Sequence, residues 1–108
     1  MTQDDQPFVT FINIFEVAPE DADAVAAKWR ERAAVMSTKP GFLDSRLHKA
    51  RSPEGRFQLV NVAHWESQEA WEAASASMDF ASRAQAAQQA TDTPLRPNTG
   101  LYDIVAEF

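Results

Sequence analysis

The chain has 108 residues and a formal net charge of −6. Its length favours one domain that spans residues 1–108, and we expect residues 1–7 to be disordered. The acidic balance argues against nucleic acid as a partner, and no apolar run approaches the roughly 20 residues of a membrane-spanning helix. The absence of cysteine excludes disulfides and thiolate sites and favours the reducing cytoplasm.

The first half of the chain predicts a strand followed by a helix. Phe8–Val17 is rich in aromatic and β-branched residues, which is typical of a strand, and both of its faces are largely apolar. Pro19 then opens a helical pattern, with acidic residues in the first turn and apolar residues at helical spacing as far as Met36. Lys39-Pro40-Gly41 ends that helix.

Two further strands and a second helix follow. Phe42–Ala50 and Phe57–Trp65 predict strands joined by a turn over 51–55. Ser67 is a good N-cap for a helix that runs to about Ala74.

The last third of the chain predicts less regular structure. We expect a break near Ser77, more helix over Phe80–Ala90 and a closing strand over Leu101–Phe108. The proline- and glycine-containing stretch before that strand predicts a loop through Pro94, Pro97, Asn98 and Gly100.

The predicted order, β-α-β-β-α-β, indicates an α+β fold of the ferredoxin-like type. In this fold the four strands form an antiparallel sheet with the first and third strands in the centre, and the helices cover one face. The other face would carry Ile12, Ile14, Val60 and Val62. A second copy of the sheet is the simplest cover for such an apolar face, so we expect a homodimer.

Two asparagines stand out within the predicted sheet. Asn13 and Asn61 lie in the middle of neighbouring strands, on faces that are otherwise apolar. Strand centres disfavour asparagine, and a buried amide without hydrogen bonds costs on the order of 1–3 kcal/mol. Either the two amides satisfy each other or a buried water, or they form a site under the helices that holds a phenolate, carbonyl or peroxide oxygen.

Tryptophans would surround this pair. Trp65 shares the face of Asn61 and could be a wall of the pocket or take a direct part in the chemistry. Trp29 and Trp71 fall on inner helix faces and are core or lining. An apolar pocket lined by aromatic side chains with few polar groups suits a flat aromatic ligand.

Other candidate groups give weaker signals. His64 has the opposite parity to Asn61 and should face the dimer seam, while His48 should be exposed or form a hydrogen bond near a strand end. Either histidine could still accept a proton in a pocket that opens at that end. Asp44 and Arg46 share a strand face and would form a solvated pair. The chain lacks metal-ligand spacing, a glycine-rich phosphate loop and a nucleophilic serine motif.

Four segments together resemble the antibiotic biosynthesis monooxygenase family, whose members form dimeric α+β barrels. They are VTFINIFEV, KPGFLDSRLH, LVNVAHWESQEAW and LYDIVAEF, and the most specific part is the N-x-x-x-W-E-S run from Asn61 to Ser67 coupled to Asn13. Within the family, the chain is most similar to small cofactor-independent oxygenases that convert anthrone-type polyketides into quinones.

The resemblance implies that Asn13, Asn61 and Trp65 are the catalytic residues. It also implies a mechanism in which the pocket stabilises the substrate anion, which itself reduces O2, so that no cofactor is needed. The residues expected to bind this small aromatic substrate are Phe11, Phe15, Trp29, Trp71, Met78 and Phe80.

Two alternatives stay open. A haem-degrading branch of the same fold also carries a first-strand asparagine and a third-strand tryptophan, but its axial histidine position falls at Ala84 here, which disfavours haem. The other alternative is a dimeric barrel that binds a small ligand without catalysis. The substrate itself and the general base are not defined by the sequence.

Overall fold

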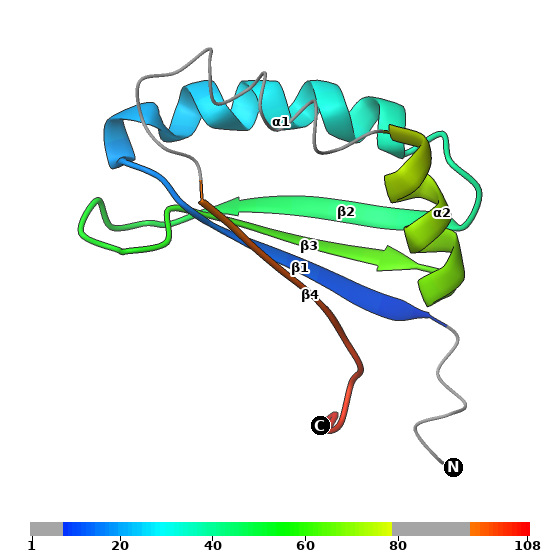
Figure 1. Cartoon of the computed structure of the whole chain (residues 1–108). Helices are drawn as coiled ribbons and strands as arrows, with labels where there is room; N and C mark the ends of the chain where they lie inside the picture. The colour runs from blue at the N-terminus through cyan, green and yellow to red at the C-terminus, as the bar shows by residue number, and fades with distance from the viewer. Residues whose placement is uncertain (1–7, 79–95) are drawn as a thin grey trace.

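The computed structural model describes residues 8–78 and 96–108. In this part of the chain, two α-helices lie on one face of a four-stranded antiparallel sheet with strand order β2-β3-β1-β4 (Figure 1). This arrangement confirms the predicted ferredoxin-like fold, with the first and third strands in the centre. The elements are β1 (Val9–Glu16), the 3-10 turn η2 (Pro19–Asp21), α1 (Ala22–Met36), β2 (Phe42–Lys49), β3 (Leu59–Trp65), α2 (Gln68–Met78) and β4 (Arg96–Tyr102).

The two central strands pair so that the predicted faces match. Asn13 lies directly opposite Asn61, and Phe11 lies opposite Ala63. Along β3, every second residue from Leu59 to Trp65 is buried and the residues between them are only half-buried. One face of the sheet is therefore packed under the helices, and the other, which we call the open face, is only partly covered.

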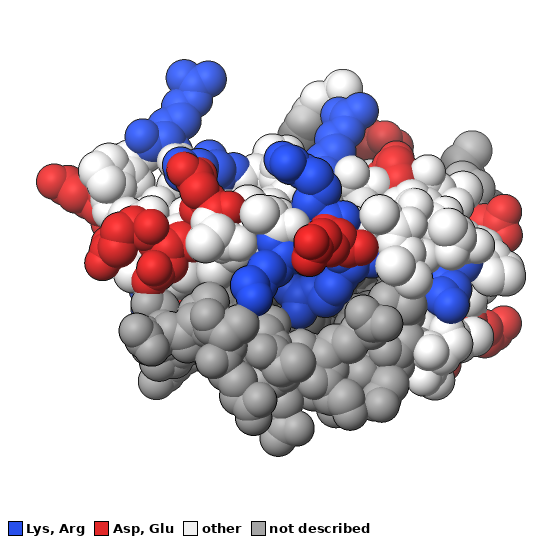
Figure 2. Space-filling view, turned by 90° about the horizontal axis from the view of Figure 1, so that it is seen from above, with Lys and Arg blue, Asp and Glu red and all other residues white. Residues whose placement is uncertain are grey.

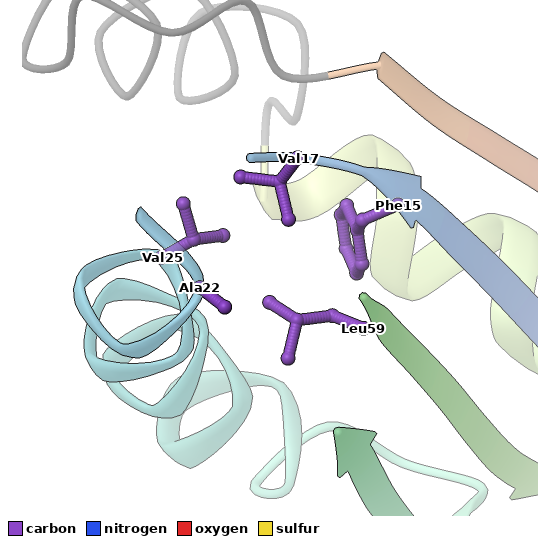
Figure 3. Packing of buried hydrophobic residues seen from close by; sticks show 5 residues of the cluster. All are labelled: Phe15, Val17, Ala22, Val25 and Leu59. Atoms are coloured by element: carbon purple, nitrogen blue, oxygen red, sulfur yellow. The ribbon is translucent and has the colours of Figure 1, made fainter. Parts of the chain in front are cut away.

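The core lies where the start of α1 passes over the end of β1 and the start of β3. Side chains from the three elements point toward one another there (Figure 3). The side chains in this cluster are Phe15, Val17, Ala22, Val25 and Leu59. A second cluster, built on Ala63, Trp65 and Ala74, packs α2 against the other end of β3.

A tight turn between α1 and β2 holds the start of α2 in place. Gly41 has φ +88°, a conformation that favours glycine, and its carbonyl accepts a hydrogen bond from the backbone N–H of Glu66 at 2.8 Å. A β-carbon at Gly41 would overlap the side chain of Ala70. Ser67 then caps α2 as predicted, accepting a hydrogen bond from the backbone N–H of Ala70 at 3.1 Å.

The last strand begins earlier than predicted. Pro97, Asn98 and Gly100 belong to β4 rather than to a loop, and the chain past Tyr102 forms no strand. β4 pairs only with β1, so it is an edge strand, where a proline without an N–H is tolerated. The Asn98 side chain adds a hydrogen bond from Nδ2 to the Ile14 carbonyl oxygen at 3.0 Å.

The second helix is also longer than predicted. It passes through Ser77, which donates a hydrogen bond from Oγ to the Ala74 carbonyl oxygen at 3.0 Å and so stays within the helix. The predicted helix over Phe80–Ala90 and the predicted loop residue Pro94 lie outside the described residues.

The open face of the sheet carries the half-buried side chains Ile12, Ile14, Val60 and Val62, as the parity predicted. Asp44 on this face pairs with His64, with Nδ1 to Oδ1 at 2.6 Å, rather than with Arg46. The ring of Phe8 lies edge-on to His64, with ring centroids 5.0 Å apart. Neither described helix has the length and apolar character needed to cross a bilayer.

Candidate active site

A cavity of about 350 Å³ lies between the sheet and the two helices. Volumes of this order suit a small organic ligand. Seven of the residues expected at the site line it, namely Phe11, Asn13, Phe15, Trp29, Asn61, Trp65 and Trp71. The side chains of the other two, Met78 and Phe80, lie outside the described part of the structure.

Asn13 and Asn61 form the floor of the cavity. Their positions in β1 and β3 are directly paired, so both side chains rise from the same point of the sheet. Asn61 is 6% exposed, and its Oδ1 accepts a hydrogen bond from Ser45 Oγ at 2.7 Å. Asn13 Oδ1 is buried and has no hydrogen-bond partner among the described residues. The Asn13 oxygen is therefore not satisfied by the neighbouring amide.

Aromatic side chains build the walls. Trp65 is 1% exposed and packs edge-on against Phe42, with ring centroids 5.3 Å apart. Trp71 from α2 stacks obliquely on Phe11 at the same centroid distance. Because these contacts fix the orientations of the rings, the cavity keeps flat apolar walls without a ligand.

Several polar lining residues were missed by the sequence analysis. Ser45, Ser75 and Thr99 line the cavity, and the Ser75 hydroxyl is buried without a partner among the described residues. Ser75 follows Trp71 by one helical turn, a signal that could have placed it. Thr99 lies opposite Asn13 in β4, which was missed because that stretch was predicted as a loop.

Arg32 is the one charged side chain among the described cavity-lining residues. It lies three residues after Trp29 in α1 and is half-buried, whereas Arg30 on the same helix is exposed. Seen from the helix side, lysines and arginines gather over the middle of the molecule with acidic side chains between them (Figure 2). Arg32 thus brings positive charge to a lining whose other described residues are uncharged.

Both histidines lie on the other side of the sheet. His64 pairs with Asp44, and His48 Nδ1 lies 3.2 Å from the Val60 carbonyl oxygen, in keeping with the predicted strand-end role. Within the described residues, no three His, Asp or Glu side chains gather as a metal site would require.

Comparison with known proteins places this geometry in a family. The profile named antibiotic biosynthesis monooxygenase matches residues 8–90, which includes Asn13, Asn61 and Trp65. The chain belongs to this family. It is accordingly a monooxygenase, as expected from the sequence.

Solved structures of antibiotic biosynthesis monooxygenases and their relatives agree with this assignment. A candidate monooxygenase from Shewanella loihica PV-4 is 29% identical, with a TM-score of 0.76 over 93% of this chain and 96% of that one. SnoaB, a cofactor-independent oxygenase from Streptomyces nogalater, is 28% identical, with a TM-score of 0.70 over 94% and 97%. The haem-degrader MhuD from Mycobacterium tuberculosis, solved with two haems in its active site, is 26% identical, with a TM-score of 0.60 over 93% and 98%. No curated protein sequence matches the chain significantly.

Because the similar structures include both a cofactor-independent oxygenase and a haem-degrader, the side chains that could ligate haem in this cavity decide between the two kinds of relative. A haem held in the usual way needs an axial ligand such as histidine, cysteine or tyrosine. The sequence has two histidines and no cysteine, and both histidines lie across the sheet from the cavity. Its one tyrosine, Tyr102, pairs with Thr10 and also lies on the open side. This donor set does not fit a histidine-ligated haem in the cavity.

Proposed function

We propose that this monooxygenase oxidises an electron-rich polycyclic aromatic substrate of the anthrone or naphthacenone type to a quinone, using O2 and no cofactor, in the cytoplasm. The observation that carries the proposal is the asparagine pair, which opens into an aromatic-walled cavity while one of its oxygens has no hydrogen-bond partner in the described part of the chain. The similarity to SnoaB over nearly the whole of both chains supports the cofactor-independent chemistry.

The proposed reaction needs only the substrate and oxygen. The CH2 group opposite the carbonyl in the central ring loses a proton, and the resulting phenolate-type anion transfers an electron to O2. The radical pair combines to form a carbon–oxygen bond, which gives a hydroperoxide on that carbon. Loss of the remaining C–H proton with cleavage of the O–O bond gives the second carbonyl and water. The CH2 group is oxidised to a ketone, and O2 is reduced to the new carbonyl oxygen and one molecule of water.

The cavity would assist at two points. The amide of Asn61 can donate a hydrogen bond to the oxygen that gains charge when the proton leaves, and a preorganised donor in an apolar site stabilises such charge strongly. Trp65, Trp71 and Phe11 would hold the flat ring system over the two asparagines. Their apolar surfaces would also keep water away from the anion and the peroxide.

Oxygen uptake and quinone absorbance with the hydroxyanthrone dithranol test the proposal on purified, colourless protein. We expect quinone formation well above the spontaneous rate, reduced on the order of 100-fold in Asn61→Ala, the loss that follows removal of one oxyanion donor. Gln68→Ala, which removes an exposed amide at the start of α2, serves as the matched control and should keep full activity. A rate in Asn61→Ala equal to that of the wild type contradicts the catalytic assignment.

Haem degradation can be separated from this activity by titration. Haem ligated by a histidine of the protein gives a shifted Soret band, and we expect none because both histidines lie across the sheet from the cavity. A ligated spectrum together with no turnover of hydroxyanthrones would overturn the proposal in favour of the MhuD-like function. Tight binding of aromatic ligands without turnover of any hydroxyanthrone would favour the non-catalytic alternative.

We also propose that the enzyme works as a homodimer joined through the open face of the sheet. The aliphatic residues on this face are half-buried in the single chain, and an apolar strip of this kind is typical of an interface. Light scattering should give a mass near twice the 12.0 kDa of one chain, and Ile12→Glu should convert the protein to monomers. A monomeric wild type at micromolar concentration contradicts this part of the proposal.

A further inference from the structure

One contact in the cavity has a consequence for ligand recognition. Ser45 donates a hydrogen bond to Oδ1 of Asn61 at 2.7 Å, and both residues line the cavity. We propose that Ser45 is a positioning residue, which fixes the Asn61 amide so that its NH2 group faces the ligand while Asn13 offers an acceptor oxygen beside it.

The argument begins with the shape of an amide. The oxygen and nitrogen ends of asparagine have nearly the same size, so neighbouring hydrogen bonds decide which end faces a cavity. Ser45 pairs with Ala63 and Leu47 pairs with Asn61, which makes Ser45 the diagonal neighbour of Asn61 on the same face of the sheet. Because the serine hydroxyl engages the amide oxygen, the amide nitrogen with its two hydrogens remains for the ligand.

Asn13 presents a hydrogen-bond acceptor beside the donor group of Asn61. Its Oδ1 accepts no hydrogen bond from any described residue although it is buried. An acceptor oxygen in this position is satisfied by an O–H or N–H group of a ligand. Because Asn13 and Asn61 are directly paired, the two ligand groups must lie side by side on one edge.

The resulting ligand class is a flat aromatic ketone, or its enolate, with a hydroxyl on the neighbouring ring position. The carbonyl oxygen would accept from Asn61 and the hydroxyl would donate to Asn13. That such a ligand is the substrate rests on the proposed function, whereas the polarity of the two amides rests on the Ser45 contact with Asn61 and on the unpartnered oxygen of Asn13.

A binding experiment tests the polarity without turnover. The probes are 1-tetralone and tetralin, which have similar shapes and differ in the carbonyl oxygen, and binding is followed by calorimetry. We expect the wild type to bind 1-tetralone about fivefold more tightly than tetralin, the equivalent of about 1 kcal/mol for one hydrogen bond. Ser45→Ala should reduce this preference to less than about twofold, and Ser45→Thr, which keeps the hydroxyl, should restore it. Ser37→Ala removes an exposed hydroxyl of a residue that does not line the cavity, and it should leave the preference unchanged.

A double-mutant cycle separates positioning from a general structural effect. If Ser45 acts through Asn61, Ser45→Ala should not change the preference further in an Asn61→Ala background. In the wild-type background, Ser45→Ala should lower kcat for dithranol more than it changes KM. A Ser45→Ala variant that is folded and keeps the full ketone preference overturns the inference, whatever its oxygenase activity. Loss of the preference in a protein without oxygenase activity would support the positioning role while contradicting the proposed function.

Discussion

The two asparagines of the cavity floor should respond oppositely to replacement by leucine. Asn13→Leu removes a buried oxygen that has no partner among the described residues, whereas Asn61→Leu removes the acceptor that the Ser45 hydroxyl uses. Both substitutions keep a side chain branched at Cγ, and both positions border the cavity of about 350 Å³, which can take the added volume. The two variants therefore differ mainly in hydrogen bonding.

The expected magnitudes follow from the state of each polar atom. An unsatisfied buried acceptor costs about 1–3 kcal/mol, so its removal in Asn13→Leu should raise the free energy of unfolding by about 1 kcal/mol after some loss of packing. At roughly 2.1 cal/mol/K of unfolding entropy per residue, a chain of this length gains about 4 °C in Tm for each kcal/mol. Asn61→Leu leaves the Ser45 hydroxyl without its partner and should lower stability by about 1–2 kcal/mol.

Urea unfolding of ligand-free protein, followed by circular dichroism, measures both changes at equal protein concentration. The same two preparations should lose activity on dithranol, so Asn13→Leu would combine higher stability with lower turnover. Equal destabilisation by the two substitutions would refute the reasoning, because it would mean that the Asn13 oxygen is as well satisfied as that of Asn61.

Three further substitutions test how the site is held and charged. Gly41→Ala should lower the free energy of unfolding, measured by urea titration, by about 2 kcal/mol or more, because the backbone there has φ +88° and the added methyl group meets Ala70 of α2. The control Gly55→Ala, at a glycine without positive φ, should lower it by less than about 1 kcal/mol in the same titration. Gln58→Ala should cost about 2 kcal/mol by thermal melting, because this residue is 2% exposed and its amide donates to two carbonyl oxygens of the preceding turn. Arg32→Gln should raise KM about 10-fold for substrates with a carboxylate, since a hydrogen bond to a charged group contributes about 1.5–3 kcal/mol, and should leave KM for neutral anthrones within twofold. The control Arg30→Gln, on the exposed side of α1, should change neither KM value.

Periodicity was sufficient to predict the fold and the residues that meet at the centre of the cavity. Two-residue alternation in β1 and β3 placed Asn13, Asn61 and Trp65 on one face, and the order of the elements made the two strands neighbours. The local alternation also determines how β1 pairs with β3, because a shift by one residue would turn the apolar side chains away from the helices. The aromatic walls followed from the same parity and from the helical spacing of Trp29 and Trp71.

The polar residues around the centre escaped prediction for identifiable reasons. The register of β2 against β3 shifts between Phe42 and Asp44, so Phe42 and Ser45 face the cavity although they are three residues apart. Simple alternation from Phe42 places Ser45 on the opposite face. Thr99 was hidden because an edge strand tolerates proline and glycine that usually indicate a loop. A bulge and an edge strand both depend on pairing partners, which local sequence does not reveal.

Buried polar side chains in this chain divide into two kinds, and the division distinguishes scaffold from site. Gln58 is almost fully buried, and its amide nitrogen donates two hydrogen bonds within the turn that it closes, so this nitrogen serves the scaffold. Asn13 Oδ1 and Ser75 Oγ are buried without partners among the described residues, come from different elements and border the same cavity. Apolar residues at those two positions would stabilise the fold, and a polar ligand that completes the hydrogen bonds of Asn13 and Ser75 is consistent with the proposed function. A ligand that restores those bonds should raise the Tm of the wild type more than that of Asn13→Leu, which ties the unsatisfied oxygen directly to binding.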